Sequence, residues 1–135
     1  MPLYICNSKT GSLNPSAKEQ IAQAITDIHC TVTGAPPVFV HAVFFEEAPQ
    51  FPLSDKTVYV RGTIRKGRTD TQKDQIAQAI QEALVTYAQV DAEQACAVIA
   101  ETPAGWVLEG GEIMPEPGEE AEWFAAQEAR RTAEA

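Results

Sequence analysis

The chain has 135 residues, 44% of them hydrophobic, which is enough for one domain with a buried core. Its formal net charge of −9 argues against nucleic acid as a partner, and no apolar run approaches the length of a membrane span. No basic segment precedes an apolar one at the start, so the expected location is the cytoplasm.

An internal repeat organises the chain. Residues 16–25, SAKEQIAQAI, return as residues 71–80, TQKDQIAQAI, with seven of ten positions identical at an offset of 55 residues. The same offset aligns LYI at 3–5 with VYV at 58–60. We therefore expect one structural unit used twice within a single domain. The expected domain covers residues 1–135. It consists of two repeat units, at about 2–46 and 57–100, and a C-terminal segment, 101–135.

The first unit begins with a predicted strand over residues 2–8, where β-branched and aromatic residues partly alternate with polar ones. Asn14 followed by proline favours a helix start, and isoleucine and valine at helical spacing predict an amphipathic helix over 15–32. Gly34 and a pair of prolines end that helix. The apolar run VFVHAVFFE, 38–46, predicts a second strand.

The second unit repeats this order. Residues 57–64 read as a strand, and Thr69 stands where a helix N-cap is expected. Isoleucine, leucine and tyrosine at positions 76, 80, 84 and 87 predict the helix, and QACAVIA at 94–100 predicts the fourth strand. The pattern is an α/β (α+β) fold built as a tandem β-α-β repeat. We expect a four-stranded mixed sheet with two helices on one face, each crossover being right-handed.

Two further expectations follow from this architecture. The strand at 38–46 is apolar on both alternating faces, so other copies of the chain are expected to cover the face that lacks helices. His41, in the middle of that strand, is expected to be a core histidine that faces into the sheet. A pseudo-twofold axis between the units would set 2–8 antiparallel to 57–64, and Pro2 would then lie near Ile64 and Arg65.

Pro2 is the most informative candidate for chemistry. An initiator methionine before a small residue is commonly removed, which would leave proline with a free secondary amine. An ordinary α-amino group titrates near pH 8, and nearby cations or burial lower its pKa, so it can act as a base or acid near neutral pH. The alternative is a proline of no chemical significance.

Arg65 and Arg68 lie in the RKGR loop that enters the second helix. Two guanidinium groups at a helix N-terminus suit a carboxylate, whereas the alternative is a solvated loop. His29 lies late on the first helix, at the flank of its apolar stripe, and is a further candidate site residue. The alternative is a surface histidine favoured by the helix C-terminus. Glu109 follows an apolar run and, as a carboxylate in an apolar setting, could activate water.

The remaining features point to no other chemistry. Three cysteines, Cys6, Cys30 and Cys96, lack metal or redox spacing and are expected to be buried or half-buried free thiols. The stretch from Glu109 onward has eight acids against two arginines and is expected to be a solvated face that finishes in a surface helix end at 129–135. No phosphate loop or metal-ligand cluster occurs, so we expect neither a cofactor nor a metal.

Taken together, these residues resemble the tautomerase superfamily, and in particular the group of cis-3-chloroacrylic acid dehalogenase and its homologues. The resemblance spans nearly the whole chain. It rests on Pro2 after Met1, NPSAKEQIAQAITDIH ending at His29, VTG at 32–34, RKGR at 65–68, ETPA at 101–104, Glu109 and PEPGEEAEWF at 115–124.

The resemblance implies a homotrimer that uses Pro2 as the catalytic amine on a small carboxylate substrate. In such dehalogenases the proline is a cationic acid, the residues matching Arg65, Arg68 and His29 hold the substrate carboxylate, and the one matching Glu109 activates water. In tautomerase relatives the proline is instead a base that moves a proton between enol and keto forms.

One departure from the dehalogenase pattern bears on the reaction. The tyrosine that pairs with the water-activating glutamate in the dehalogenase is replaced by Val98, which cannot orient water. A keto–enol tautomerase acting on a 2-oxo acid, its enol or a 3-substituted acrylate is therefore the first expectation. A haloacrylate dehalogenase or hydratase that uses Glu109 alone, and a non-catalytic trimer that binds small carboxylates, are the alternatives.

Overall fold

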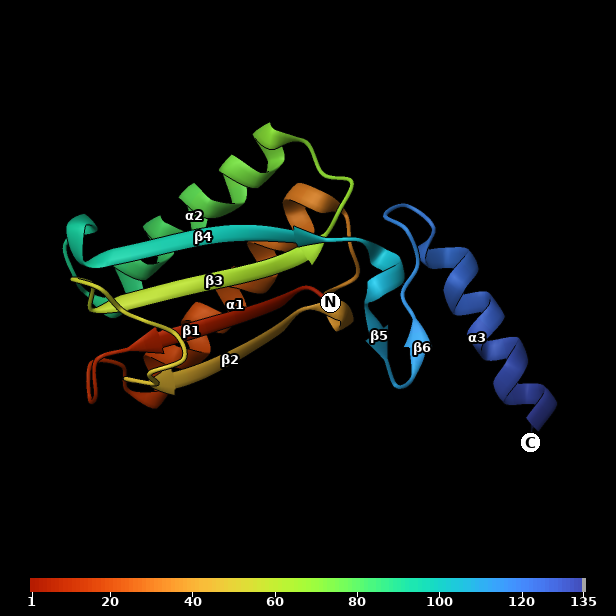
Figure 1. Ribbon diagram of the computed structural model, residues 1–135, viewed down its shortest axis with the longest axis horizontal. Helices are drawn as coiled ribbons and strands as arrows, with labels where there is room; N and C mark the ends of the chain where they lie inside the picture. Colours follow the sequence, from red (N-terminus) through yellow and green to blue (C-terminus); the bar gives the residue numbers. More distant parts are fainter. Residues whose placement is uncertain (135) are drawn as a thin grey trace.

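The computed structural model describes residues 1–134, in which one sheet has two long helices on one face and a C-terminal extension at one end (Figure 1). The sheet has the order β2-β1-β3-β4. Its strands are β1 (Leu3–Ser8), β2 (His41–Glu46), β3 (Val58–Arg65) and β4 (Ala95–Thr102), and its helices are α1 (Pro15–Thr33) and α2 (Asp70–Ala88).

The strand directions follow the repeat. β1 pairs in parallel with β2, β3 pairs in parallel with β4, and the central pair β1–β3 is antiparallel. In that central pair Leu3 lies opposite Thr63, so the same register continued by one residue sets Pro2 against Ile64. The tandem β-α-β fold, the mixed sheet and the two helices on one face, all expected from the sequence, are confirmed.

Local signals in the sequence determine where both helices begin. The Asn14 side chain accepts a hydrogen bond from the amide of Ala17 at 2.8 Å, which satisfies one of the free donors of the first turn. Thr69 and Gln72 form a capping box at the start of α2. α1 ends at Gly34, whose positive φ of 76° is left-handed and suits glycine.

The main core lies between the sheet and the helices. Tyr4 and Cys6 from β1 meet aliphatic side chains of both helices, which repeat every fourth residue and so occupy one helix face. Cys30 and Cys96 are partly buried, and all three cysteines are free. The fully buried aliphatic residues of this core are Ile21, Ile25, Val58, Val60, Ile76, Ile80 and Leu84.

The segment before β2 differs from its predicted form. Residues 38–40 are not part of the strand, because Pro37–Phe39 form a 3₁₀ turn, η1, which the fixed φ of Pro37 favours. The prediction for His41 is wrong as well. Ala42 and Phe44 pack against the core, and the strand alternation therefore turns His41 to the other face, where it is exposed.

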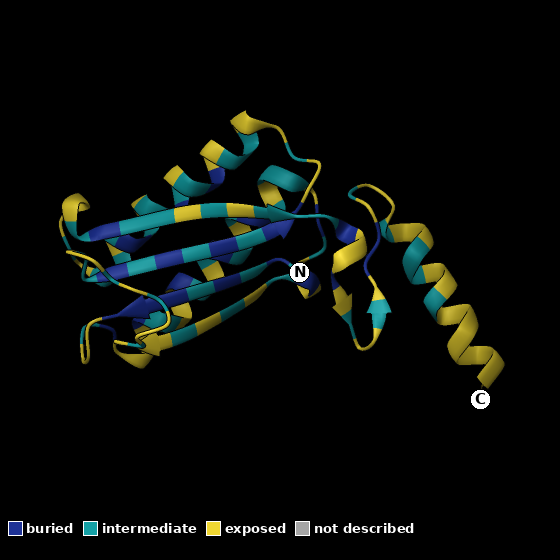
Figure 2. Ribbon diagram, in the orientation of Figure 1, coloured by how far each residue is buried: buried dark blue, intermediate teal, exposed yellow. Residues whose placement is uncertain are grey.

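A C-terminal extension lies beside the end of the sheet where the chain begins (Figure 1). β4 leads through a 3₁₀ turn to a small hairpin and then to a helix, most of which is exposed (Figure 2). The expected helix end is helical through Glu134, and Ala135 lies outside the described residues. The elements are η3 (Ala104–Trp106), β5 (Leu108–Glu109), β6 (Glu112–Ile113) and α3 (Glu120–Glu134), while a further turn, η2 (Ala92–Gln94), precedes β4.

Within residues 1–134, none of the helices has both the length and the apolar character that a membrane crossing requires.

Candidate active site

The start of the chain lies in a partly enclosed position at one end of the sheet. Pro2 is fully buried, and its carbonyl oxygen accepts a hydrogen bond from the His41 amide at 3.0 Å, which ties the first residues to β2. The amino group of Met1 donates to the Glu109 carboxylate from the hairpin. Burial, followed by the positive charge of Arg65, lowers the pKa of this amino group to about 6.

Glu109 therefore faces the amino terminus, as the hairpin of β5 and β6 lies beside the start of β1 (Figure 1). The His41 Nε2 lies 3.6 Å from the same Glu109 carboxylate oxygen. Val107 and Met114, on either side of the hairpin, are buried and hold it in place. An amine and a carboxylate in contact, with an imidazole close by, form a group that can exchange protons.

Arg65, the last residue of β3, is buried and already has protein partners. Its Nη1 donates to the carbonyl oxygen of Pro115 at 2.6 Å, and its Nη2 donates to the Glu120 carboxylate at 2.9 Å. Its guanidinium lies 5.3 Å from the ring centre of Phe39. A guanidinium has five N–H donors, and these contacts direct two of its nitrogens to the C-terminal extension.

Arg68 lies three residues further on, in the loop before α2. Its Nη1 donates to the carbonyl oxygen of Thr33 at 3.1 Å, so the loop is held against the end of α1. Burial, followed by the charge of Arg65, lowers the pKa of Arg68. The group stays charged at neutral pH. Among the described residues no carboxylate forms an ion pair with it, so its positive charge is incompletely compensated and favours a bound anion.

His29 is a buried residue of α1 rather than a surface histidine. Its Nδ1 lies 2.9 Å from the hydroxyl oxygen of Tyr4 on β1. Burial, followed by the charges of Arg68, Arg65 and the amino terminus, lowers the pKa of His29 to about 4. The imidazole is therefore neutral at neutral pH, because the positive charges of these three groups and burial disfavour its charged form.

The structure thus brings five candidate residues to one end of the sheet, namely Pro2, His29, Arg65, Arg68 and Glu109. Sequence reasoning missed two of their neighbours. Tyr4 lies on the same face of its strand as Pro2, because side chains two residues apart point to the same side. This alternation is the signal that could have placed Tyr4 toward α1. Nothing in the sequence distinguishes Glu120 from the other glutamates of the tail as a site residue, because its partner Arg65 is 55 residues away.

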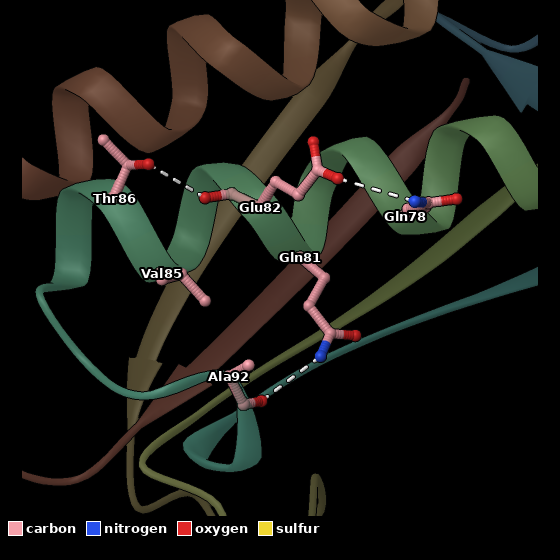
Figure 3. Close-up of a pocket in the computed structure, with 6 residues that line it drawn as sticks. All are labelled: Gln78, Gln81, Glu82, Val85, Thr86 and Ala92. Atoms are coloured by element: carbon pink, nitrogen blue, oxygen red, sulfur yellow. Dashed lines mark hydrogen bonds between the residues drawn. The ribbon is translucent and has the colours of Figure 1, made fainter.

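Val98 lies away from this group in the described chain. It is on β4, opposite Arg61 of β3, and is 40% exposed on the face of the sheet without helices. A separate concavity of about 610 Å³ lies on the outer face of α2, lined by Gln78, Gln81, Glu82, Val85, Thr86 and Ala92 (Figure 3). Its polar groups bond to one another, as Gln81 does to the Ala92 carbonyl oxygen at 3.2 Å, and we assign no chemistry to it.

Comparison with known families and structures supports one relationship. A family model described as "Putative oxalocrotonate tautomerase enzyme" matches residues 1–129. A search of curated proteins finds no match.

Several solved structures share the fold. N1, described as a member of the cis-3-chloroacrylic acid dehalogenase family, is 26% identical with a TM-score of 0.83, and the match covers 92% of this chain and 91% of that chain. Native Ps01740 is 31% identical with a TM-score of 0.72, covering 80% of this chain and 100% of that chain. A fused 4-OT, described as a symmetric trimer, is 21% identical with a TM-score of 0.71 over 84% and 95% of the two chains, and shows the fold alone.

Proposed function

The chain belongs to the oxalocrotonate tautomerase family of the tautomerase superfamily, and we propose that it is an enzyme whose N-terminal proline, freed by removal of Met1, transfers protons on a small carboxylate. The substrate class is a 2-oxo acid and its enol. The observation that carries the proposal is the amino terminus itself, which contacts Glu109 and has a pKa lowered to about 6.

Pro2 acts as the base in this proposal. Removal of Met1 moves the amino group inward by one residue, into the neighbourhood of Arg65, whose charge favours the neutral form of the amine. A neutral secondary amine at pH 7 can take the hydroxyl proton from C2 of the enol and return a proton to C3. The product is the 2-oxo acid, and no atom is gained or lost.

Arg68, Arg65 and His29 bind the substrate carboxylate. Arg68 supplies incompletely compensated positive charge, and Arg65 retains donors beyond the two nitrogens that its partners use. We assign the tautomer of His29 in which Nδ1 accepts from the Tyr4 hydroxyl, because a neutral imidazole then carries its proton on Nε2 and can donate it to the carboxylate.

A second candidate is hydrolytic dehalogenation or hydration of a 3-substituted acrylate. It is favoured by the similarity to N1 and by the position of Glu109 at the amine, where a carboxylate can activate water. In that reaction Pro2 is a cationic acid that protonates carbon. Val98 weighs against it, because a valine cannot help Glu109 to orient the water. A non-catalytic carboxylate-binding protein remains the third alternative.

We also propose that the working unit is a homotrimer. The face of the sheet that lacks helices is the surface we assign to the contacts between subunits. Val43, Phe45 and Val98 there are 42%, 39% and 40% exposed, an unusual accumulation of apolar side chains on one open face.

The test compares the wild type with Pro2→Ala, using Pro49→Ala in an exposed loop as the matched control. We expect Pro2→Ala to lower kcat for ketonisation of 2-oxo acid enols about a hundredfold to ten-thousandfold, the usual contribution of a general base, while Pro49→Ala is unchanged. Mass spectrometry should find a chain lacking Met1. Full activity in Pro2→Ala, or a mature chain that retains Met1, contradicts the proposal.

The pH profile separates the two candidate reactions. A base must be unprotonated, so kcat/KM for ketonisation should rise as pH rises through the pKa of the Pro2 amine, which burial and Arg65 should lower, and then level off. An acid must be protonated, so turnover of cis-3-chloroacrylate should instead fall as pH rises through the same range.

A further inference from the structure

His41 lies beside the candidate active site, and neither candidate reaction assigns it a role. It is the first residue of β2, and its amide donates to the Pro2 carbonyl oxygen at 3.0 Å, so the backbone holds it next to the amino terminus. In the register of the sheet it lies opposite Leu3. Because the strand turns its side chain away from the helices, the imidazole is 56% exposed and the core does not need it. A polar side chain fixed at this place is available for chemistry.

The imidazole faces the carboxylate of Glu109. His41 Nε2 and Glu109 Oε1 are 3.6 Å apart, which is too far for a direct hydrogen bond. Two polar atoms at this distance can instead share one water that contacts both. The Glu109 side chain is 29% exposed and lines an open groove of about 690 Å³, so water has a path to the carboxylate.

The amino group of Met1 marks a position for such a water in the mature chain. It donates to the same Oε1 atom of Glu109 that His41 faces. Only two carbon atoms, the carbonyl carbon and Cα of Met1, separate it from the nitrogen of Pro2. Once Met1 is removed, a water at this position lies on the carboxylate and next to any substrate atom that takes the place of those carbons beside Pro2.

His41 can supply the hydrogen bond that Val98 cannot. In residues 1–134 the ion-pair partners of the Glu109 carboxylate are the Met1 amino group and His41, so His41 is the one that remains after Met1 is removed. An imidazole with its proton on Nε2 donates to the water oxygen, as the hydroxyl of a tyrosine would. The water then donates to Glu109, which leaves a lone pair of its oxygen free to attack.

We propose that His41 is a catalytic residue that holds the attacking water together with Glu109, so that the enzyme hydrates 3-substituted acrylates in spite of Val98. The inference rests on the second candidate reaction of the proposed function. Glu109 takes a proton from the water as the water oxygen bonds to C3. The electron pair of the C2–C3 π bond then takes the proton of the Pro2 ammonium at C2, and the proton on Glu109 restores that ammonium. With cis-3-chloroacrylate the adduct loses chloride and its hydroxyl proton to give 3-oxopropanoate.

The experiment follows cis-3-chloroacrylate and the enol of 2-oxopropanoate, whose ketonisation consumes no water, in the wild type, His41→Ala and Glu46→Ala. Glu46, exposed at the other end of β2, is the matched control. His41→Ala should lower the ratio of kcat for dehalogenation to kcat for ketonisation about tenfold to a hundredfold, the usual effect of one hydrogen bond to an ionising group. KM for cis-3-chloroacrylate should change little, because His41 binds the water and not the substrate carboxylate. Glu46→Ala should leave the ratio unchanged.

Two further variants separate catalysis from packing. His41→Gln keeps a side-chain N–H donor and should retain more dehalogenation than His41→Ala, whereas His41→Leu fills the space without a donor and should be as slow as His41→Ala. Equal rates in the glutamine and leucine variants would show that bulk alone matters and would overturn the inference. An unchanged ratio in His41→Ala would overturn it too, as would a wild type that does not dehalogenate cis-3-chloroacrylate.

Two measurements distinguish failure of this inference from failure of the proposed function. A crystal structure of the chain without Met1 should contain a water within about 3.2 Å of both the Glu109 carboxylate and His41 Nε2, and side chains that face apart would reject the inference. Ketonisation that is lost in Pro2→Ala, together with a ratio that does not depend on His41, rejects the role of His41 and keeps the function. Dehalogenation that depends on His41 and persists in Pro2→Ala supports the water site and rejects the function of Pro2.

Discussion

Tyr4 connects the sheet to the candidate site through a single contact. It lies on β1 opposite Gly62 of β3, and its hydroxyl reaches Nδ1 of His29 on α1. A Cβ atom built on Gly62 would lie 2.4 Å from Cε1 of Tyr4 and 3.0 Å from Cδ1 of Ile99. Both neighbours are ring or branched side chains in a packed interior, so the absence of a side chain at Gly62 is what allows the tyrosine to reach the histidine.

Gly62→Ala should therefore destabilise the protein by about 1–3 kcal/mol, the usual cost of inserting a methyl group into a packed core. The displaced ring should also weaken the hydrogen bond to His29. Urea unfolding measures the change in free energy, and Gly105→Ala, at a site with nothing within 4 Å of the new atom, is the control. Equal stability of the two variants would show that the sheet absorbs the methyl group without strain.

At the scale of elements, α3 is attached to the rest of the molecule at two places. Its later turns donate to the Glu112 carboxylate of β6 through Gln127 and Arg130, and its first turn makes the more buried contacts. Glu120 accepts from Arg65, which has lost nearly all contact with water, and Trp123 and Phe124 pack on Phe39. Beyond them most of the helix is exposed (Figure 2). The pKa of the Glu120 carboxyl is lowered, with burial opposing the shift and the hydrogen bond from Arg65 favouring the ionised form.

Glu120→Gln should loosen this attachment, since it removes the charge that compensates a buried guanidinium. We expect a loss of about 2–4 kcal/mol, somewhat below the full cost of breaking a buried pair because the amide still accepts a hydrogen bond. Hydrogen exchange of the α3 amides should accelerate while exchange in β1 and β3 changes little. Glu119→Gln, one residue earlier and exposed, should behave like the wild type. Slow exchange in the Glu120 variant would mean that the aromatic contacts, together with the bonds of Gln127 and Arg130 to Glu112, are enough to hold α3.

On the scale of the whole molecule, the two faces of the sheet are unequal. Both helices cover one face, and the other presents a row of side chains from four strands in which Val43, Ile5, Arg61 and Val98 are neighbours. Nη1 of Arg61 is buried without a hydrogen-bond partner among the described residues. An apolar surface with an unsatisfied donor is suited to contact with another subunit.

Val43→Glu should disrupt the proposed trimer, because a carboxylate buried at a subunit contact without a partner costs several kcal/mol. We expect the midpoint concentration for dissociation of the trimer to rise at least about a hundredfold over the wild type. Because that midpoint varies as the square root of a three-chain dissociation constant, the change corresponds to about 5.5 kcal/mol per trimer. Light scattering coupled to size exclusion measures the mass. Gln78→Glu, on the outer face of α2 (Figure 3), should leave the assembly intact. An unchanged mass in Val43→Glu rules out this face as the contact.

The sequence by itself determined the architecture. The repeat of SAKEQIAQAI as TQKDQIAQAI, the caps at Asn14 and Thr69 and the alternation of the strands are local signals, and each acts within a few residues. Duplication then supplied the symmetry that set β1 antiparallel to β3 and brought Pro2 to the end of that strand. For the same reason the prediction that Pro2 lies near Arg65 needed no knowledge of packing.

Only the tertiary structure decided the environment of each candidate group. His41 was predicted in the core and is exposed, His29 is buried beside Tyr4, and Arg65 is engaged by Glu120. The contact of His29 with Tyr4 joins two elements 25 positions apart. The contacts of Arg65 with Glu120 and of the amino terminus with Glu109 depend on α3 and the hairpin, and they join residues 55 or more positions apart. Burial and charge at such distances along the chain arise from the packed fold, and a pattern read over neighbouring residues carries no record of them.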